Sequence, residues 1–376
     1  MKGATPYRIL QVGMSPYYGG TEAFLMNQYR KLDRTKIQFD FLNVFSQPIA
    51  CEQEIEELGG KIYHLNMQRH KGLKQYYRNL DHFFREHSGK FHAIHCNLQS
   101  LVNVDLLKYA KKYAIPVRIA HAHNAGYGKE PGKLQKLLIF LNKRTVKRCA
   151  THYFACSELA AKWMFNAQAT VINNAIDARV YRFCEQTRNE LRAEMGLGKE
   201  PVVIFVGRLD PQKNPIFLLE IFKELLTFWE DAKLLVVGDG ILRPQMETFI
   251  VENGLQSGVA MLGTRGDVSR LLQAADVFLL PSRFEGLGIV LVEAQAAGMP
   301  AFTSKDVVPE AVKITDFLEF IPLTHTPLQW AQRIAENANT ARQDSLEAVI
   351  RAGYDTAANA QKLQKLYISM LEEDHA

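Results

Sequence analysis

Two segments in the second half of the chain combine charged residues with glycine in a pattern suited to anion binding. The first is GRLDPQKNP, residues 207–215, which follows the apolar run VVIFVG. The guanidinium fork of Arg208 and the point charge of Lys213 would stand at a strand end, where both can bind diphosphate oxygens. A solvated polar turn could have the same sequence, so this segment alone leaves both interpretations open.

The second segment is PSRFEGLGIVLVE, residues 281–293, which joins a buried strand to a helix. Gly286 and Gly288 allow backbone N–H groups to approach a ligand closely, at a helix end whose dipole favours anions. On this interpretation, Glu285 in the loop can reach sugar hydroxyls. Glu293, in the second helical turn, can reach a ribose diol, with the phosphates between them.

A purely structural interpretation treats Glu285 as a charge that complements the helix dipole and Glu293 as an exposed helix residue. The apolar neighbours of Glu293 argue against the second half of it, because they predict a largely buried helix. A buried carboxylate should have a polar partner.

Short β-rich runs alternate with longer amphipathic stretches along the whole chain, which predicts parallel sheets covered by helices on both faces. The strand-like runs are RILQVG, FDFLNVF, KIYHLN, FHAIHC, VRIAHA and HYFACS in the first half, and VVIFVG, KLLVVG, VAML, DVFLLP, PAFTS and FLEFIP in the second. Residues 173–199 are polar and irregular. Two Rossmann-like domains, residues 1–178 and 179–355, are therefore expected.

Residues 356–376 are expected to form a C-terminal amphipathic helix that packs back on the first domain. The spacing of Ala360, Leu363, Tyr367 and Leu371 predicts its buried face.

Charge divides unevenly between the two halves. Residues 1–178 carry 25 Lys and Arg against 13 Asp and Glu, and the remainder carries 20 against 27, so the net charges are +12 and −7. A basic half suggests an anionic partner. No apolar run reaches the length of a membrane span, and the N-terminus lacks a secretory signal, so a cytoplasmic protein is expected. The five cysteines are scattered and suggest neither disulfides nor a zinc site.

The segments GRLDPQKNP and AADVFLLPSRFEGLGIVLVEAQAAGMP together resemble the retaining glycosyltransferases of family four. Further matches are the Gly19-Gly20 loop, RIAHAHN, YFACSE, VINNAID and VVGDG, so the resemblance covers nearly the whole chain. It implies the GT-B fold, in which two Rossmann-like doubly wound α/β domains face a central cleft.

The resemblance also implies roles for the two segments. Arg208 and Lys213 would bind the donor diphosphate and neutralise the departing nucleotide. Gly288 and Ile289 would offer backbone N–H groups to the same phosphates. No metal would be needed, since the cationic side chains supply the positive charge and no suitable Asp-x-Asp motif occurs.

By the same resemblance, Glu293 would bind the ribose and Glu285 the transferred sugar. Gly20 would approach the donor from the first domain. A histidine of RIAHAHN would lie near the anomeric carbon, with His123 the better match and His121 the alternative. Either could instead be a strand-end histidine bonded to backbone.

Two departures from the family pattern concern the surroundings of the site. Asn173 and Ala175 replace the usual Pro and Gly of the hinge, and the loop near Asp306 lacks a glycine pair, although Glu310 holds the place of the family's Glu.

The resemblance is to bacterial exopolysaccharide and capsule glycosyltransferases. It implies a retaining hexosyltransferase with no cofactor, which takes a nucleotide-sugar donor, by default a UDP-sugar with GDP-mannose as the alternative. The acceptor would be a growing, lipid-linked saccharide.

Other enzyme classes fit the sequence less well. A GT-B epimerase would not need the full set of charged residues, and a phosphorylase would be longer. A dehydrogenase would need a GxGxxG segment after the first strand, where GMSPYYGG stands. A non-catalytic sugar-nucleotide-binding partner is the alternative from another class. Nucleic acid is not expected as a partner, because no binding module is recognisable.

Residues 129–148 form a basic amphipathic segment that could lie on an anionic membrane surface. Leu134, Leu137, Leu138 and Leu141 form a helical stripe among seven Lys and Arg residues. In the alternative interpretation, this stripe packs on the sheet and the basic residues are merely solvated.

Overall fold

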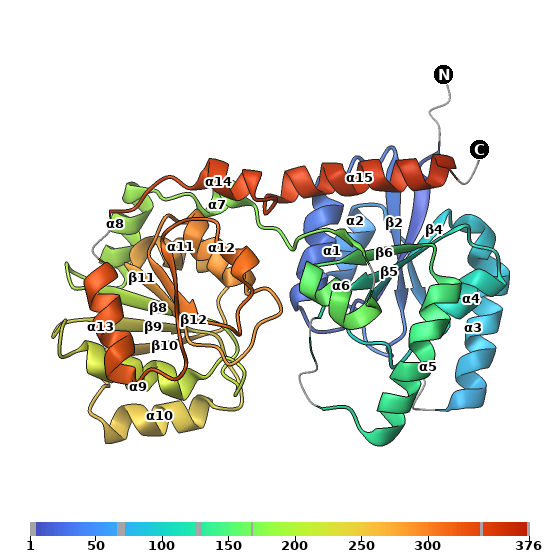
Figure 1. The fold of residues 1–376 in the computed structure, drawn as a ribbon. Helices are drawn as coiled ribbons and strands as arrows, with labels where there is room; N and C mark the ends of the chain where they lie inside the picture. The colour runs from blue at the N-terminus through green and yellow to red at the C-terminus, as the bar shows by residue number, and fades with distance from the viewer. Residues whose placement is uncertain are drawn as a thin grey trace. The chain divides into compact units, whose positions relative to one another are not determined.

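The structure, a computed structural model, describes residues 5–65, 72–124, 126, 130–166, 168–338 and 341–373. They form two compact units (Figure 1). The first unit combines Met1–Ala175 with Thr356–Ala376, and the second is Ile176–Asp355. None of the described helices is long and apolar enough to span a membrane. Lys129, the first basic residue of the 129–148 segment, lies outside the described residues.

The first unit contains a parallel seven-stranded sheet of order β3-β2-β1-β4-β5-β6-β7. Its elements are β1 (Tyr7–Val12), α1 (Gly20–Lys31), β2 (Ile37–Asn43), α2 (Glu52–Glu57), β3 (Ile62–His64), α3 (Leu73–His87), the 3-10 turn η2 (Ser88–Lys90), β4 (Ala93–Leu98), α4 (Asp105–Lys112), β5 (Val117–Ala122), α5 (Lys133–Cys149), β6 (His152–Ala155), α6 (Glu158–Phe165), β7 (Thr170–Val171) and α15 (Thr356–Glu373).

Alternate residues of these strands enter two separate hydrophobic clusters, one on each face of the sheet. Ile9 of β1 packs with α1 and α15, whereas Leu10 packs with α3, α4 and α5 on the other face. Helix α15 lies beside α1 and buries Ala360, Leu363, Tyr367 and Leu371, as its spacing predicted (Figure 1). The C-terminal helix is thus part of the first unit's core.

The second unit contains a parallel six-stranded sheet of order β10-β9-β8-β11-β12-β13. Its elements are α7 (Ala178–Tyr181), α8 (Glu185–Glu194), β8 (Val202–Val206), α9 (Pro215–Leu225), β9 (Lys233–Val237), α10 (Arg243–Glu252), β10 (Val259–Gly263), α11 (Val268–Ala274), β11 (Val277–Leu280), α12 (Ile289–Ala296), β12 (Ala301–Ser304), the 3-10 turn η3 (Glu310–Val312), β13 (Leu318–Ile321), α13 (Pro327–Asn337) and α14 (Leu346–Arg351).

In each sheet the strand order reverses at one point, between β1 and β4 in the first unit and between β8 and β11 in the second. Ligands of open α/β sheets bind at the carboxyl ends of the strands beside such a switch point. The segments GRLDPQKNP and PSRFEGLG directly follow β8 and β11, so both lie at the switch point of the second unit.

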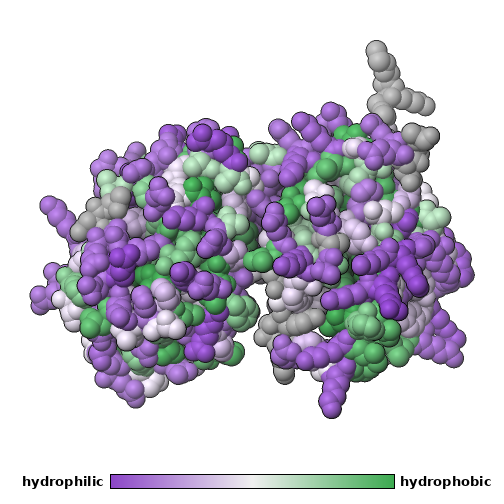
Figure 2. Space-filling view, viewed as in Figure 1, coloured by the Kyte–Doolittle hydropathy of each residue, from purple (hydrophilic) through white to green (hydrophobic). Residues whose placement is uncertain are grey.

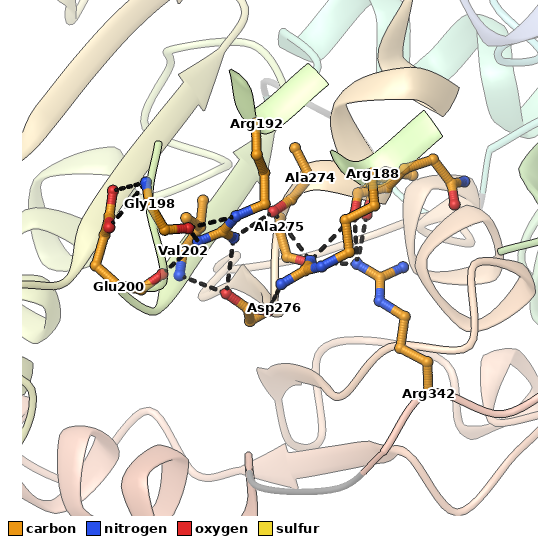
Figure 3. Close-up of polar contacts among 11 residues, drawn as sticks. Arg188, Arg192, Gly198, Glu200, Val202, Ala274, Ala275, Asp276 and Arg342 are labelled. Atoms are coloured by element: carbon orange, nitrogen blue, oxygen red, sulfur yellow. Dashed lines mark hydrogen bonds and ion pairs between the residues drawn. The ribbon is translucent and has the colours of Figure 1, made fainter. Parts of the chain in front are cut away.

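At the other end of β8 and β11, three arginines bind the start of both strands (Figure 3). The Asp276 carboxylate, just before β11, accepts bonds from Arg188 Nη2 at 2.6 Å, from Arg192 Nη1 at 3.3 Å and from the Val202 N–H at 2.8 Å. Arg342 donates to the carbonyls of Leu272, Gln273, Ala275 and Ala297. Desolvation, with repulsion from Arg188, lowers the pKa of Arg342 to about 9.

These bonds satisfy carbonyls at the end of α11, where no further helical turn supplies N–H donors to them. Arg188 donates to the carbonyls of Gln273, Ala274 and Ala275, and Arg192 to Ala274, Gly198 and Glu200. Two adjacent strands are thereby held in register at their amino ends, and the loops at their carboxyl ends share the same frame.

Replacement of Arg192 should destabilise the second unit. Its side chain is only 8% exposed and pairs with Asp276, so Arg192→Met should leave buried carbonyls and a carboxylate with fewer donors. We expect a loss of about 3 kcal/mol in unfolding free energy, from urea denaturation followed by tryptophan fluorescence. Arg265→Met, which removes a guanidinium paired with Asp267 in an exposed loop, is the control and should leave the urea midpoint unchanged.

Helix α5 packs by a different face from the leucine stripe. Ile139, Asn142, Val146 and Cys149 are buried, and Asn142 Nδ2 donates to the Leu101 carbonyl at 2.8 Å. Leu134, Leu137 and Leu141 of the stripe are exposed, as is Phe140, and Leu138 is half-buried. The interpretation that this stripe packs on the sheet is therefore wrong, because the buried face lies elsewhere around the helix.

Candidate active site

Glycine allows the loop after β8 to pack against the loop after β9. Gly238 has φ of 131°, and a Cβ there would lie 1.9 Å from the Gly207 carbonyl oxygen. A Cβ at Gly240 would lie 2.5 Å from the Leu209 carbonyl oxygen. Side chains at either position would force the backbones apart, so the path of residues 207–213 depends on these two glycines.

The loops that follow β8 and β11 are hydrogen-bonded to each other. The Arg283 N–H donates to the Gln212 carbonyl at 2.7 Å, and Gln212 Nε2 donates to the Phe284 carbonyl at 3.2 Å. The Glu285 N–H donates to the Val307 carbonyl at 3.0 Å, which ties in the loop after β12. Three strand ends thus share one bonded set of loops.

Lys213 and Glu285 form an ion pair at this junction. Lys213 Nζ lies 2.6 Å from Glu285 Oε1, and the two side chains are 12% and 5% exposed. Ser282 Oγ donates to the same carboxylate oxygen at 2.6 Å. An ion pair this buried keeps both charges in place, because either charge alone would be costly to desolvate.

Arg208 behaves differently from Lys213. Its side chain is 71% exposed and contacts Asp210 at 3.2 Å and Gln212 Oε1 at 3.2 Å. The structure does not bond Arg208 to Lys213 or Glu285. The guanidinium of Arg208 is exposed on the loop, and an incoming anion can replace Asp210 as its partner.

Helix α12 begins directly after the second segment. Gly288 is its N-cap with φ of 77°, a left-handed conformation that favours glycine, and Ile289 is the first helical residue. The first N–H groups of an α-helix have no acceptor one turn earlier and carry partial positive charge. Here the Leu291 N–H bonds to the Gly288 carbonyl at 2.8 Å, so the N–H groups of Ile289 and Val290 are the ones best placed to bind an anion. Together with Lys213 and Arg208, they give the carboxyl edge of β8 and β11 several groups that attract anions.

Glu293 lies on α12, one turn beyond this N-terminus, and is half-buried. Desolvation raises its pKa to about 7, against a smaller opposing effect of a hydrogen bond with Tyr181 of α7. The partner that a buried carboxylate requires is therefore Tyr181, a residue for which the sequence offers no signal beyond its aromatic character.

The first unit presents its own glycine loop at the carboxyl end of β1. Glu22 holds this loop, since its carboxylate accepts from the Ser15 N–H at 2.8 Å and from the Gly19 N–H at 3.0 Å. Gly20 is the first residue of α1, and a Cβ there would meet nothing within 4 Å. The space beside Gly20 is therefore open.

His121 and His123 lie at the carboxyl end of β5, both buried, with ring centroids 4.1 Å apart. His123 Nε2 contacts Asn97 Oδ1 at 2.8 Å, and His121 Nδ1 contacts His95 Nε2 at 2.9 Å. Both rings therefore bond to side chains, and the interpretation in which they bond to backbone is wrong. Asn97 and His95 were not predicted as site residues.

The structure thus gathers the predicted residues into two groups. Lys213, Glu285, Arg208, Gly288 and Ile289 lie on the neighbouring loops of the second unit, with Glu293 one turn along α12. Gly20, His121 and His123 lie at the carboxyl edge of the first unit's sheet. Among the described residues, no cluster of His, Cys, Asp or Glu side chains is arranged to hold a metal ion.

Comparison with known proteins gives the family. The sequence model described as "Glycosyl transferases group 1" matches residues 187–336, which include β8 to β13 and both charged segments. EpsF of Bacillus subtilis strain 168, whose name describes it as a glycosyltransferase, is 30% identical over 378 residues, covering 98% of each chain. The chain belongs to the group 1 glycosyltransferases.

Two further relatives extend the comparison. The Escherichia coli protein named UDP-Gal:α-D-GlcNAc-diphosphoundecaprenol α-1,3-galactosyltransferase is 28% identical over 206 residues, covering 52% of this chain and 53% of its own. Anabaena HepE, solved in complex with UDP, superposes with a TM-score of 0.70 at 20% identity, over 97% of this chain and 98% of its own. The fold of this glycosyltransferase is GT-B, as the sequence predicted.

The raised pKa of Glu293 predicts how stability changes with pH in this glycosyltransferase. Below pH 4.5 the carboxyl group is protonated in the folded and unfolded states alike. Between pH 4.5 and 7 the unfolded chain releases the proton and the folded chain keeps it, so stability falls as pH rises. Glu293→Gln should remove this fall and be more stable than the unmodified protein above pH 7, by about 3 kcal/mol at most.

The measurement is urea unfolding at pH 4.5, 6 and 8. Glu252→Gln, which changes an exposed glutamate of α10, is the matched control and should follow the unmodified protein. Parallel pH dependences for the unmodified protein and Glu293→Gln would contradict the assignment.

Proposed function

We propose that this glycosyltransferase transfers a hexose from a UDP-sugar, with retention of anomeric configuration and without a metal, to a lipid-linked saccharide. The observation that carries the proposal is the bonded pair of loops after β8 and β11. It places the buried Lys213–Glu285 pair, the exposed Arg208 and the start of α12 at one switch point.

The cationic groups suit a nucleoside diphosphate. Lys213 and Arg208 can neutralise the charge that develops on the departing nucleotide, and the first turn of α12 can bind its phosphate oxygens. This supply of positive charge supports transfer without a metal. UDP is the proposed nucleotide because the structurally similar HepE binds it and the Escherichia coli relative is named for UDP-Gal.

Glu285 suits hydrogen bonding to the transferred sugar. Its Oε1 accepts from both Lys213 and Ser282, so this oxygen is held in a fixed position by two donors. A carboxylate held in this way can orient the hydroxyls of the transferred sugar, and such positioning lowers the barrier to the reaction. Glu293 is proposed to bind the ribose, and His123 and Gly20 to contact the donor sugar.

The acceptor proposal rests on relatives and on surface chemistry. The Escherichia coli relative is named for a diphosphoundecaprenol acceptor, and EpsF is similar along its whole length. A lipid-linked acceptor places the enzyme at the cytoplasmic face of a membrane, in exopolysaccharide or capsule assembly.

Removal of either cationic side chain should slow transfer. Arg208→Ala and Lys213→Ala should each lower kcat by about a hundredfold, because each removes a charge that stabilises the departing diphosphate. Transfer to a diphosphoundecaprenol-linked sugar is measured with UDP-sugars in EDTA, and proton NMR of the product reports the anomeric configuration. Lys223→Ala, on the far end of α9, is the control and should retain full activity.

An inverted product, or activity lost in EDTA and restored by a divalent cation, would reject the mechanism. Donor binding without turnover by any acceptor would favour a non-catalytic binding partner.

Helix α5 supports the proposed membrane location. Its exposed apolar residues Leu134, Leu137, Phe140 and Leu141 are flanked by Lys143, Arg144, Lys147 and Arg148 on the same helix. Hydrophobic surface is visible on this part of the first unit (Figure 2). An exposed apolar stripe bordered by basic residues matches an anionic bilayer, with headgroup attraction of about 1 kcal/mol per basic residue.

Vesicle cosedimentation should therefore show binding to anionic vesicles and none to neutral ones, and salt should weaken it. Lys143→Glu with Arg144→Glu should abolish binding, because the double change reverses two charges beside the apolar stripe. Lys362→Glu with Lys365→Glu makes the same charge change on α15, which covers the opposite face of the sheet, and should bind as before. Failure of the unmodified protein to bind anionic vesicles at low salt would favour a soluble acceptor.

A further inference from the structure

A polar network lies inside the first unit, beneath α15, where strands of a parallel sheet are usually apolar. Gln11 of β1 pairs in register with His95 of β4, and Asn97 of β4 pairs with His121 of β5. All four side chains are at most 5% exposed. Tyr367 of α15, fully buried, brings its hydroxyl to the same place. We call these five residues the buried polar network.

One branch of the network leads from Tyr367 to His123 by hydrogen bonds. Gln11 Nε2 donates to the Tyr367 hydroxyl at 3.1 Å, and Asn97 Nδ2 donates to Gln11 Oε1 at 3.3 Å. Asn97 Oδ1 in turn contacts His123 Nε2 at 2.8 Å.

The other branch leads through two histidines. The Tyr367 hydroxyl contacts His95 Nδ1 at 2.5 Å, and His95 Nε2 contacts His121 Nδ1 at 2.9 Å. The His121 ring then packs on the ring of His123. Phe24 of α1 closes over both rings with edge contacts. The site histidine is therefore connected to the C-terminal helix along two routes.

The backbone carbonyl of Val12 fixes the orientation of the Asn97 amide and, through it, the position of the proton on His123. Asn97 Nδ2 donates to the Val12 carbonyl at 2.9 Å, and a carbonyl can only accept. Asn97 must therefore turn Oδ1 toward His123, and since Oδ1 also only accepts, the proton of His123 lies on Nε2.

The same reasoning assigns the protons of the second branch. Because Tyr367 accepts from Gln11, its own proton goes to His95 Nδ1, and His95 then carries its proton on Nε2 and donates to His121 Nδ1. The remaining proton of His121 lies on Nε2. Burial lowers the pKa of His95 and of His123 to about 3 and lowers the pKa of His121 as well, so all three rings are neutral near pH 7.

One consequence concerns the free atom of His123. Neutral and protonated on Nε2, His123 keeps a lone pair on Nδ1, and this atom has no hydrogen-bond partner among the described residues. A buried acceptor without a partner costs free energy in the free protein. It is a feature suited to a hydroxyl group that arrives with a ligand.

We propose that Asn97 and Tyr367 are positioning residues, which hold His123 as the neutral tautomer protonated on Nε2 so that Nδ1 accepts a hydrogen bond from a substrate hydroxyl. The role of His123 toward substrate rests on the proposed function. The assignment of its proton rests only on the network.

The first experiment measures the tautomers without substrate. Long-range proton–nitrogen NMR of protein labelled with ¹⁵N-histidine distinguishes a bare Nδ1 from a protonated one, with assignment by single His→Gln variants. In the unmodified protein at pH 7, His95, His121 and His123 should all show a bare Nδ1 and a protonated Nε2.

Two variants separate the branches. Asn97→Leu removes the anchor to Val12 and should convert the His123 signals to those of mixed tautomers. Tyr367→Phe keeps the ring but removes the hydroxyl, so His95 and His121 should become mixed while His123 stays as it was. Tyr29→Phe removes another buried tyrosine hydroxyl, bonded to Gln38 and the Leu58 carbonyl, and is the matched control with unchanged histidine signals.

The second experiment measures kinetics with the donor and acceptor of the proposed function. Asn97→Leu should lower kcat by about tenfold and change the donor KM by less than about twofold, since the lost orientation acts in the transition state. A protonated Nδ1 on His123 in the unmodified protein, or an unchanged His123 tautomer in Asn97→Leu, overturns the proposal. A third outcome is that the NMR signals are as predicted but Asn97→Leu and His123→Ala both keep full activity. That outcome would confirm the proton assignment made from the network and reject the role of His123 toward substrate.

Discussion

Burial of both sheets on both faces governs where polar groups can lie in this protein. Parallel strands covered by helices have no solvated face, so a polar side chain within them must find a partner or be costly. At the carboxyl edge of each sheet the chain leaves the strands and forms loops, and polar groups on these loops can contact a ligand. The charged loops of the second unit and the glycine loop of the first both occur there.

The second unit meets this constraint by pairing charges with opposite charges or with helix ends. At the amino ends of β8 and β11, Arg188 and Arg192 pair with Asp276 and also bind the carbonyls that end α11 (Figure 3). At the carboxyl ends, Lys213 pairs with Glu285. In the first pairing the guanidinium groups are also taken up by backbone carbonyls, so this pairing is structural. The second lies beside the exposed Arg208 and the start of α12. The surroundings of the two pairings thus distinguish a structural cluster from a candidate ligand-binding site.

Much of the fold follows from the sequence because its strands are short, apolar and separated by amphipathic helices. Each of the twelve strand-like runs is a strand in the structure, and the two Rossmann-like units follow from their alternation. Strand β7 was missed because it has only two residues. Helix α8 was missed because its packing rests on Arg192 as well as Leu191, and an arginine that packs on carbonyls does not produce an apolar stripe.

The candidate site was predictable as a set of residues but not as a set of bonds. Lys213 and Glu285 belong to recognisable segments, but the sequence assigned them separately, to the diphosphate and to the sugar of the donor. It did not predict that the two side chains bond to each other, because their contact joins positions 72 residues apart. The partners of the histidines are harder still, since Tyr367 and His95 are 272 residues apart. Periodicity places Tyr367 on a buried helix face, but it does not tell which buried polar group that face will cover.

The membership of α15 in the first unit has a consequence for biosynthesis. The chain leaves this unit after Ala175, makes the whole second unit, and returns only with Thr356. Domains generally fold as they leave the ribosome, the amino-terminal one first. Here the earlier unit lacks helix α15, which packs against Ile9, Phe39 and Ile119, until residues 356–373 are translated. The second unit, continuous in sequence, can therefore reach its native state before the first. A message truncated just before the codon for Thr356 would yield a chain with one finished unit and one sheet face covered by α1 but not by α15.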